Sequence, residues 1–160
     1  MQNLKALLER LLENQIDFVL VGGFAGVLHG STLVTQDLDI CAAITQEQVD
    51  KLRHALADLH PVLRMNPNIQ PSFLEQPKNL AGVHNIYLKT DLGILDIMSE
   101  LPPVGSFETL KKNSMEISIY GHQCRVISLD DLIAIKQSMT RPKDQETLRQ
   151  LLKIKNLKNT

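Results

Sequence analysis

The spacing of apolar residues changes along the first quarter of the chain, and each spacing predicts a different element. Leucines recur three and four residues apart within residues 4–14, as on a helix with one apolar face. Residues 18–21 are apolar without interruption, which is typical of a buried strand. The pair Gly22-Gly23 then breaks the run, so we expect the chain to turn there.

Further apolar stretches predict a short helix over residues 24–29 and a second strand over residues 34–43. Thr45 begins a capping-box pattern, so the next helix should start there and run to about Leu59. The stretch that follows is rich in Pro, Asn and Gln, and we expect an irregular or partly stranded connection over residues 61–82.

The second half of the chain combines hairpins with helices. Two hairpins and two helices are expected at residues 85–98, 115–127, 129–137 and 144–157. Hairpins in place of a regular strand–helix–strand alternation favour an α+β fold, with a small mixed β-sheet flanked by helices and with C-terminal helices. We expect one domain over residues 1–160, with its sheet within about 16–127 and its last helices within about 128–157.

Composition narrows the classes of function. The chain carries a formal net charge of −1 and 4% aromatic residues, so neither general DNA binding nor an aromatic platform for single strands is favoured. The segment after Glu146 is locally basic, which fits a solvated helix end better than a dedicated partner site. No apolar run reaches the length of a membrane span and no signal peptide is evident, so we expect a cytoplasmic protein without a membrane partner.

Cysteine and histidine form no metal-binding pattern. Cys41 and Cys124 lie far apart in apolar, strand-like runs, which argues against a disulfide framework and against a cysteine-based metal site. The five histidines are scattered, and none forms a ligand pair with another. The candidate chemistry is carried instead by aspartates.

The triplet Asp37-Leu38-Asp39 is the first candidate. Such a triplet arises readily by chance in a chain with ten aspartates, so its setting decides its meaning. Residues two apart on a strand point to the same face, which brings the two carboxylates together. Paired carboxylates on a half-buried strand repel each other. They are tolerated at a solvated strand end, or where a divalent cation such as Mg²⁺ neutralises them.

Two further features favour the cation. Gly22-Gly23 stands between a strand and a short helix, where glycines allow close backbone approach and free N–H groups attract a phosphate. Asp96 lies in another apolar strand, where a lone carboxylate is costly without a partner. Three strand-borne carboxylates beside a phosphate-binding turn suggest two-metal phosphoryl chemistry. The alternatives are an ordinary strand-to-helix turn and an Asp96 that bonds to its own hairpin backbone.

With these residues in place, the sequence resembles the DNA polymerase β-like nucleotidyltransferase superfamily. Gly22-Gly23, thirteen intervening residues and Asp37-Leu38-Asp39-Ile40 match its glycine pair and Asp-x-Asp strand, and Asp96 matches its third carboxylate. The stretch 30–37 and the segment from Lys136 to Asp144 are similar to small prokaryotic members, among them the AbiEii-like toxins of toxin–antitoxin systems.

The resemblance implies roles for these residues. Asp37, Asp39 and Asp96 would hold Mg²⁺ or Mn²⁺ and form the catalytic centre, and Asp96 would also accept the proton of the attacking hydroxyl. The nucleoside triphosphate would be bound by Gly22, Gly23, Ser31, Thr35, Lys136, Arg141 and Lys143. The reaction would transfer a nucleoside monophosphate to a hydroxyl of a protein, a tRNA or a small molecule and release pyrophosphate.

Other interpretations stay open for parts of this site. Ser31 and Thr35 could serve equally well as backbone caps, and the turn from Arg141 to Asp144 is equally compatible with structural salt bridges. Many members of the superfamily carry an arginine shortly before the Asp pair, whereas residues 33–36 contain none. The alternative function is therefore a catalytically weak or inactive binding module, or a toxin–antitoxin component that works with a separately encoded partner protein.

Overall fold

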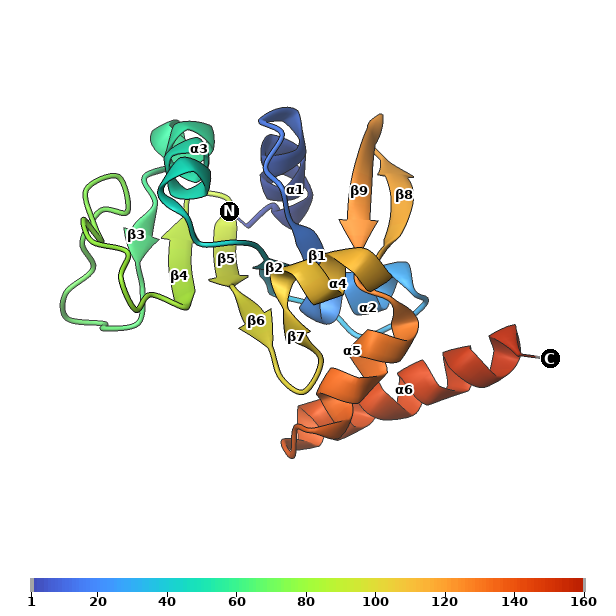
Figure 1. The fold of residues 1–160 in the computed structure, drawn as a ribbon. Helices are drawn as coiled ribbons and strands as arrows, with labels where there is room; N and C mark the ends of the chain where they lie inside the picture. Colours follow the sequence, from blue (N-terminus) through green and yellow to red (C-terminus); the bar gives the residue numbers. More distant parts are fainter. Residues whose placement is uncertain (1, 160) are drawn as a thin grey trace.

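A seven-stranded mixed β-sheet lies at the centre of the computed structural model, which describes residues 2–159 (Figure 1). Its strands follow the order β3-β4-β5-β2-β1-β9-β8. Their bounds are β1 (Val19–Val21), β2 (Asp37–Cys41), β3 (Val62–Leu63), β4 (Asn85–Thr90), β5 (Gly93–Met98), β8 (Met115–Ile119) and β9 (His122–Val126). β2 runs antiparallel to β1 and parallel to β5, so both directions meet at the centre of the sheet.

Helices flank this sheet. In the described part of the chain they are α1 (Leu4–Glu13), α2 (Gly22–Leu28), α3 (Gln46–Leu56), α4 (Phe107–Asn113), α5 (Leu129–Gln137) and α6 (Pro142–Lys158). α1 packs against α3, β2 and β5, whereas α5 and α6 pack against each other at the opposite end of the molecule (Figure 1). The predicted α+β fold with a mixed sheet, flanking helices and C-terminal helices is confirmed. Among residues 2–159 no helix has the length and apolar character needed to cross a membrane.

The hydrophobic core lies on one face of the central strands. In β2, Leu38 and Ile40 are fully buried, whereas Asp37 and Asp39 alternate with them and face the other side. The regularly spaced leucines of α1 are buried and belong to the same core. Because a shift of β2 by one residue would turn both aspartates into this core, the apolar alternation fixes the register of the strand.

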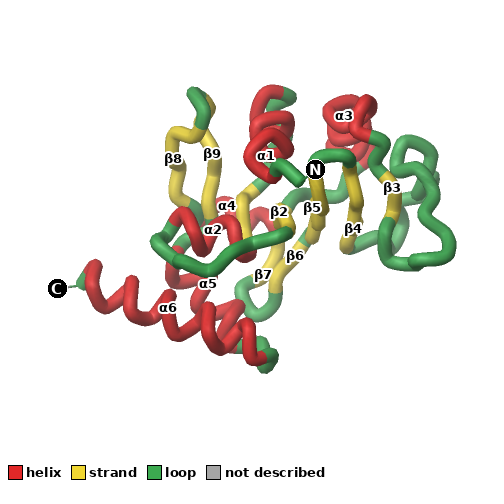
Figure 2. Tube along the Cα trace, turned by 180° about the vertical axis from the view of Figure 1, so that it is seen from behind, coloured by secondary structure: helices red, strands yellow, loops and turns green. Residues whose placement is uncertain are grey.

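Several element boundaries differ from the predicted ones. β2 begins at Asp37, so residues 34–36 belong to the loop that leaves α2; in Figure 2 this loop crosses the molecule above α6. Gly22 already starts α2, and α3 ends at Leu56 in a 3-10 turn over residues 57–59. Apolar content overestimated β2 because backbone hydrogen bonds, and not hydropathy, define where an element ends.

Two short units were not predicted. β6 (Glu100–Leu101) and β7 (Gly105–Ser106) form a small ribbon around Pro102-Pro103, and α4 follows it directly. Elements of this length are too short for an apolar period to be recognised. The predicted hairpin over residues 115–127 is present as β8 and β9, and its turn is Tyr120-Gly121, where both residues have positive φ.

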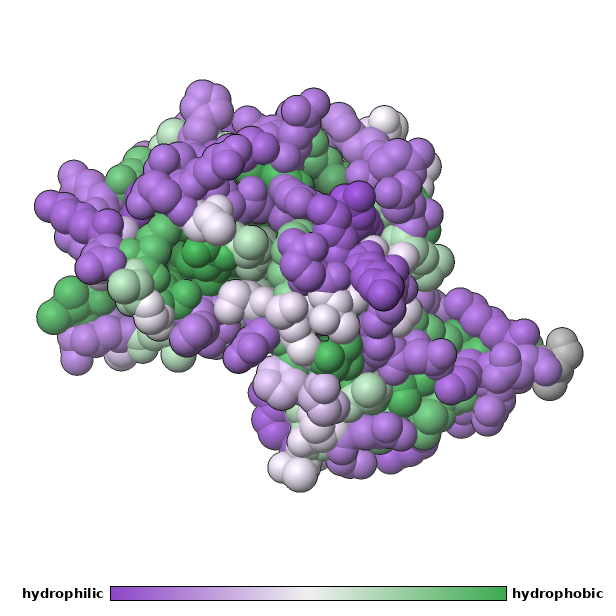
Figure 3. All heavy atoms as spheres, viewed as in Figure 1, coloured by the Kyte–Doolittle hydropathy of each residue, from purple (hydrophilic) through white to green (hydrophobic). Residues whose placement is uncertain are grey.

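The connection between the 3-10 turn at residues 57–59 and β4 is irregular, as predicted. Of the described residues 61–82, only the two residues of β3 are stranded, apart from one isolated bridge between Val62 and Ser72. Met65, Ile69 and Leu74 in this connection are exposed. Figure 3 shows hydrophobic surface on this side of the molecule, and its outline is indented between this part and the lobe formed by α5 and α6.

The central position of β2 makes its apolar face a test of the fold. We expect Leu38→Ala to lower the free energy of unfolding by about 2–5 kcal/mol, because Leu38 is fully buried and its loss leaves a cavity in the core. Leu152→Ala, in which the side chain is 38% exposed, should change it by about 0.5 kcal/mol at most. Urea unfolding of both variants measures the difference, and equal losses would contradict the placement of the core.

Candidate active site

Five residues, in or directly after neighbouring strands, lie in one row across the sheet. The Arg64 N–H, just after β3, donates to the Tyr87 carbonyl of β4. Tyr87 pairs with Asp96 of β5, Asp96 pairs with Asp39 of β2, and Asp39 pairs with Val21 of β1. Directly paired residues share a face of a sheet, so Tyr87, Asp96 and Asp39 lie on the face opposite Leu38 and Ile40, and the buried Val21 ends the row.

Three carboxylates meet in this row. Asp37, Asp39 and Asp96 each offer one oxygen atom, and these atoms lie within 4.8 Å of one another. The pKa of Asp39 is raised from 3.8 to about 6, first by burial and then by repulsion from Asp96 and Asp37. An all-oxygen donor set with this excess of negative charge fits a hard divalent cation such as Mg²⁺ or Mn²⁺.

The turn from β1 into α2 lies directly against the carboxylate of Asp39. Gly22 has a φ of +68°, and a Cβ there would lie 2.2 Å from Oδ2 of Asp39. A Cβ on Gly23 would lie 2.8 Å from Oγ1 of Thr35. No side chain fits at either position without movement of its neighbour, so the glycine pair is required by the close approach of the turn to Asp39 and Thr35.

Arg64 is a site residue that the sequence did not indicate. Its Nη2 lies 2.6 Å from Oδ2 of Asp96, and its Nε lies 3.2 Å from Oδ1, which is a two-point ion pair. Burial raises the pKa of Asp96, and the guanidinium of Arg64 opposes that rise. Arg64 follows a strand of two residues inside the irregular connection; the apolar pair Val62-Leu63 before it is the only signal that could have found it.

The C-terminal cations of the predicted site converge on Asp144. This carboxylate is 1% exposed and lies 2.8 Å from Nε of Arg141 and 3.1 Å from Nζ of Lys136. Its pKa is held below the usual range, first by Arg141 and then by Lys136. The structural salt bridge considered for this turn is therefore present, with Lys136 as an additional member. Within residues 2–159 Lys143 has no ion-pair partner.

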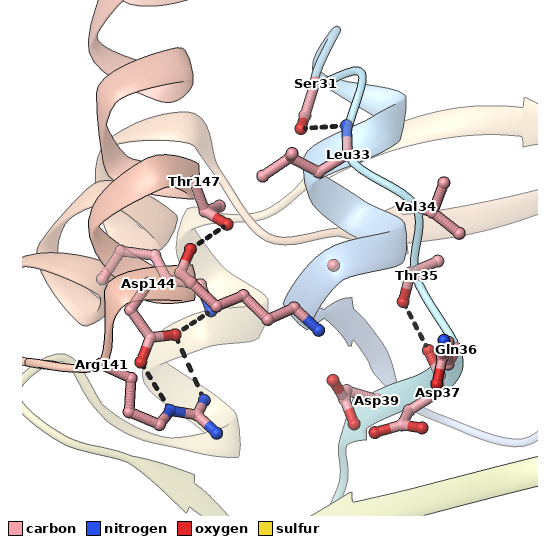
Figure 4. A pocket seen from close by; sticks show the side chains of 13 residues that line it. Ser31, Leu33, Val34, Thr35, Gln36, Asp37, Asp39, Arg141, Asp144 and Thr147 are labelled. Atoms are coloured by element: carbon pink, nitrogen blue, oxygen red, sulfur yellow. Dashed lines mark hydrogen bonds and ion pairs between the residues drawn. The ribbon is translucent and has the colours of Figure 1, made fainter.

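A polar cavity of about 140 Å³ lies between the loop after α2 and the start of α6 (Figure 4). Gly23, Ser31, Thr35 and Lys143 line it, together with Asp37, Asp39, Lys136 and Arg141. Both hydroxyls already act as local donors: Ser31 to the Gln150 side chain at 3.0 Å, and Thr35 to the Asp37 carbonyl at 3.0 Å. Figure 4 shows Arg141 and Asp144 on one side of this cavity and Thr35, Asp37 and Asp39 on the other.

A second cavity, of about 400 Å³, adjoins the first. The two share Asp37, Asp39, Lys136 and Arg141, and the second adds Gly22, Arg64, Tyr87 and Asp96. The structure thus brings together all ten residues that the sequence assigned to the site, around one group of carboxylates with a cavity on each side.

The contact between Gly22 and Asp39 can be tested with a matched pair of glycine substitutions. Gly22 and Gly121 have φ values of +68° and +79°, but a Cβ on Gly121 meets nothing within 4 Å. We expect Gly121→Ala to cost about 1 kcal/mol for its backbone conformation alone, and Gly22→Ala to cost about 3 kcal/mol or more because Asp39 must also move. Equal losses of unfolding free energy would contradict the close approach.

Because the pKa of Asp39 is raised, replacing this aspartate should increase the stability of the protein by an amount that depends on pH. The fold disfavours the charged form of Asp39, so this group destabilises the metal-free protein increasingly as pH rises from 3.8 to about 6. In the presence of EDTA, Asp39→Asn should stabilise the protein by about 1–3 kcal/mol at pH 7.5, and the gain should vanish near pH 4. Asp50→Asn, at a 62% exposed carboxylate, is the control and should give no such gain. A gain that is equal at both pH values would contradict this account.

Comparison with solved structures shows the fold shared with known nucleotidyltransferases. The lincosamide antibiotic adenylyltransferase LnuA, bound to lincomycin, matches with a TM-score of 0.64 and 18% identity over 94% of this chain and 95% of that one. ANT(2'')-Ia in complex with adenylyl-2''-tobramycin matches with a TM-score of 0.57 and 15% identity, over 96% of this chain and 94% of that one. An antigenic nucleotidyltransferase-like protein from Paracoccidioides brasiliensis matches with a TM-score of 0.61 and 16% identity, over 96% of this chain and 73% of that one.

A family model assigns the chain more directly. No curated protein sequence matches it significantly. None of these comparisons bears on the narrower resemblance to AbiEii-like toxins, which stays a prediction. The model of the family described as nucleotidyl transferase of unknown function, DUF2204, matches residues 1–159. The chain therefore belongs to this nucleotidyl transferase family.

Proposed function

We propose that this protein is an active, metal-dependent nucleotidyltransferase that moves a nucleoside monophosphate from a nucleoside triphosphate to the hydroxyl of a small-molecule acceptor. One observation carries the proposal: three carboxylate oxygens within 4.8 Å of one another lie where two cavities meet. A two-substrate transfer requires such an arrangement, because the donor and the acceptor must both reach the same reacting phosphate.

Asp37, Asp39 and Asp96 would hold the divalent cations. When bound, the cations would neutralise the carboxylates and stabilise the charge that develops on the transferred phosphate. The raised pKa of Asp39 supports this assignment, because it reflects a negative charge that the described side chains only partly compensate. The two nearby cations, Lys136 and Arg64, lower that pKa less than burial and the neighbouring aspartates raise it.

The polar cavity would take the triphosphate. Gly22 and Gly23 keep the backbone of the turn free of side chains next to Asp39. Lys136, Arg141 and Lys143 line this cavity from α5 and α6. They would supply the basic contact to the triphosphate, because residues 33–36 lack the arginine that many members of the superfamily carry there. Arg141 is 72% exposed, so it can contact phosphate oxygens while it stays paired with Asp144, and Lys143 has no ion pair within the described chain. Ser31 and Thr35 would add hydroxyl contacts.

Asp96 would act on the acceptor. In the proposed step, the acceptor oxygen forms a bond to the α-phosphorus, the bond from that phosphorus to the bridging oxygen breaks, and pyrophosphate leaves. The proton of the hydroxyl passes to the carboxylate of Asp96. Burial raises the pKa of Asp96, which favours proton acceptance, while the ion pair with Arg64 fixes the orientation of the carboxylate.

The acceptor class is supported by two structural neighbours. Those structures contain lincomycin and an adenylylated tobramycin, both small molecules. The second cavity of this chain, at about 400 Å³, is of the size that such ligands occupy. We therefore propose a small-molecule acceptor in preference to a protein side chain or a tRNA end.

Transfer of label from a nucleotide tests the proposal. The protein is incubated with Mg²⁺, a cell extract and each of the four nucleoside triphosphates labelled at the α-phosphate. We expect label in an acceptor, and a loss of roughly hundredfold or more in Asp37→Ala and in Asp39→Ala, because each removes charge that acts on the transition state. Asp50→Ala, on exposed surface of α3, is the matched control and should transfer at the wild-type rate.

Two results would contradict the proposal in different ways. Transfer that survives in both aspartate variants would rule out the proposed centre. The alternative of a binding module predicts that Mg²⁺ and a triphosphate raise the melting temperature of the wild type, and not of Asp39→Asn, while no label is transferred in any extract.

A further inference from the structure

Apolar side chains form part of the lining of the second cavity. Met98 of β5, Leu101 of β6, and Leu132, Ile135 and Met139 of the α5 region make up this apolar wall. Met98, Leu101 and Met139 are only partly buried, so the wall is accessible from the cavity. This lining differs from that of the first cavity, where Ser31, Thr35, Gln36 and Lys143 dominate.

The charges around the second cavity are divided by position. Its acidic residues in the described chain are Asp37, Asp39 and Asp96, which all belong to the proposed reacting centre. Its remaining charged residues are the cations Arg64, Lys136 and Arg141. With the divalent cations of the proposed function bound to these three aspartates, a positively charged acceptor would meet no free carboxylate in this lining, and it would lose hydration next to three cationic side chains.

Arg64 is held so that it faces an acceptor. Its guanidinium lies 5.6 Å from the ring centre of Tyr87, and its side chain is 27% exposed. Two of its five N–H groups point to Asp96, which leaves others to donate to a ligand. The same side chain can therefore orient Asp96 and contact an oxygen of the acceptor.

We propose that the second cavity is the acceptor site and that it selects a small molecule with an apolar body, uncharged or anionic and not cationic, with its hydroxyl at Asp96 and any acidic group at Arg64. This inference rests on the proposed function and goes beyond it, because it states the chemical class of the acceptor. A lining with three cationic side chains beside an apolar wall favours a small molecule over an RNA end, which is bound mainly through its phosphates.

Three dansyl compounds test the charge preference without any reaction, in saturating Mg²⁺ so that the three aspartates are neutralised. Dansylamide is neutral, dansylglycine carries a carboxylate and dansylcadaverine carries an ammonium, while the apolar fluorescent body is the same. We expect saturable binding of dansylamide and dansylglycine with enhanced, blue-shifted emission. Dansylcadaverine should bind about tenfold more weakly or worse, because it places a cation next to Arg64 and Arg141.

Two variants locate the binding. Leu101→Glu places a carboxylate on the apolar wall. It should therefore lower the affinity for dansylglycine about tenfold and should not lower the affinity for dansylcadaverine. Leu152→Glu, on exposed surface of α6, is its control and should change neither. Arg64→Gln should reduce the affinity for dansylglycine to that for dansylamide. Arg125→Gln, which removes an arginine paired with Asp17 far from the cavity, should leave both affinities as they are. Circular dichroism and thermal melting show that each variant is folded.

Several results would overturn the proposal. They are the absence of saturable binding in the wild type, binding of dansylcadaverine as tight as that of dansylglycine, and equal effects of Leu101→Glu and Leu152→Glu. Saturable binding of deacylated tRNA by a protein that binds no dansyl compound would favour an RNA acceptor instead. The proposed function fails separately: if Mg²⁺ and a triphosphate neither raise the melting temperature nor support label transfer, the reaction is wrong even where the probes bind as expected.

Discussion

Repulsion among Asp37, Asp39 and Asp96 is the constraint on which much of the structure depends. The parallel pairing of β2 with β5 places Asp39 directly beside Asp96, and the alternation along β2 adds Asp37 to the same face. Burial then removes part of the hydration that these carboxylates would have in water. The opposite faces of the same strands hold the core, so the strands cannot shift to relieve the repulsion without exposing Leu38 and Ile40.

The surroundings of the three carboxylates meet this constraint unequally. Asp96 has a two-point ion pair with Arg64. Asp39 instead has the backbone of Gly22 against it, and its nearest cations act only at a distance. Lys136 would be the natural partner for Asp39, but its ammonium is bound to Asp144, which also holds Arg141. The nearby cationic side chains are therefore paired with Asp96 and Asp144, and the negative charge of Asp37 and Asp39 on β2 is only partly compensated. This uncompensated negative charge supports the proposed cation site.

Local pattern predicted the parts of this site that a single strand determines. Alternation along β2 indicated that Asp37 and Asp39 share a face, and the break at Gly22-Gly23 indicated a turn. Contact between Asp39 and Asp96 could not be predicted from periodicity. The two residues have 56 others between them, and the residue pattern within a strand does not indicate which strand lies next to it in the sheet. Only the family resemblance suggested it. Neither periodicity nor the family resemblance indicated Arg64. The strand before it, β3, has only two residues, and Arg64 joins the row only because β3 pairs with β4.

One helix links the two cavities. Leu132, Ile135 and Lys136 lie three and four residues apart and so share a face of α5, with Met139 one turn further along. Lys136 lines both cavities, whereas Leu132 and Ile135 line only the apolar one. The start of α5 is fixed by the Ser128 hydroxyl, which accepts the Asp131 N–H, and its end is tied to α6 through Lys136 and the buried Asp144. The residues that α5 contributes to the two cavities are therefore held by one helix that is anchored at both ends. The proposed transfer would depend on this arrangement, because the acceptor oxygen and the phosphorus would have to approach each other at the same three aspartates.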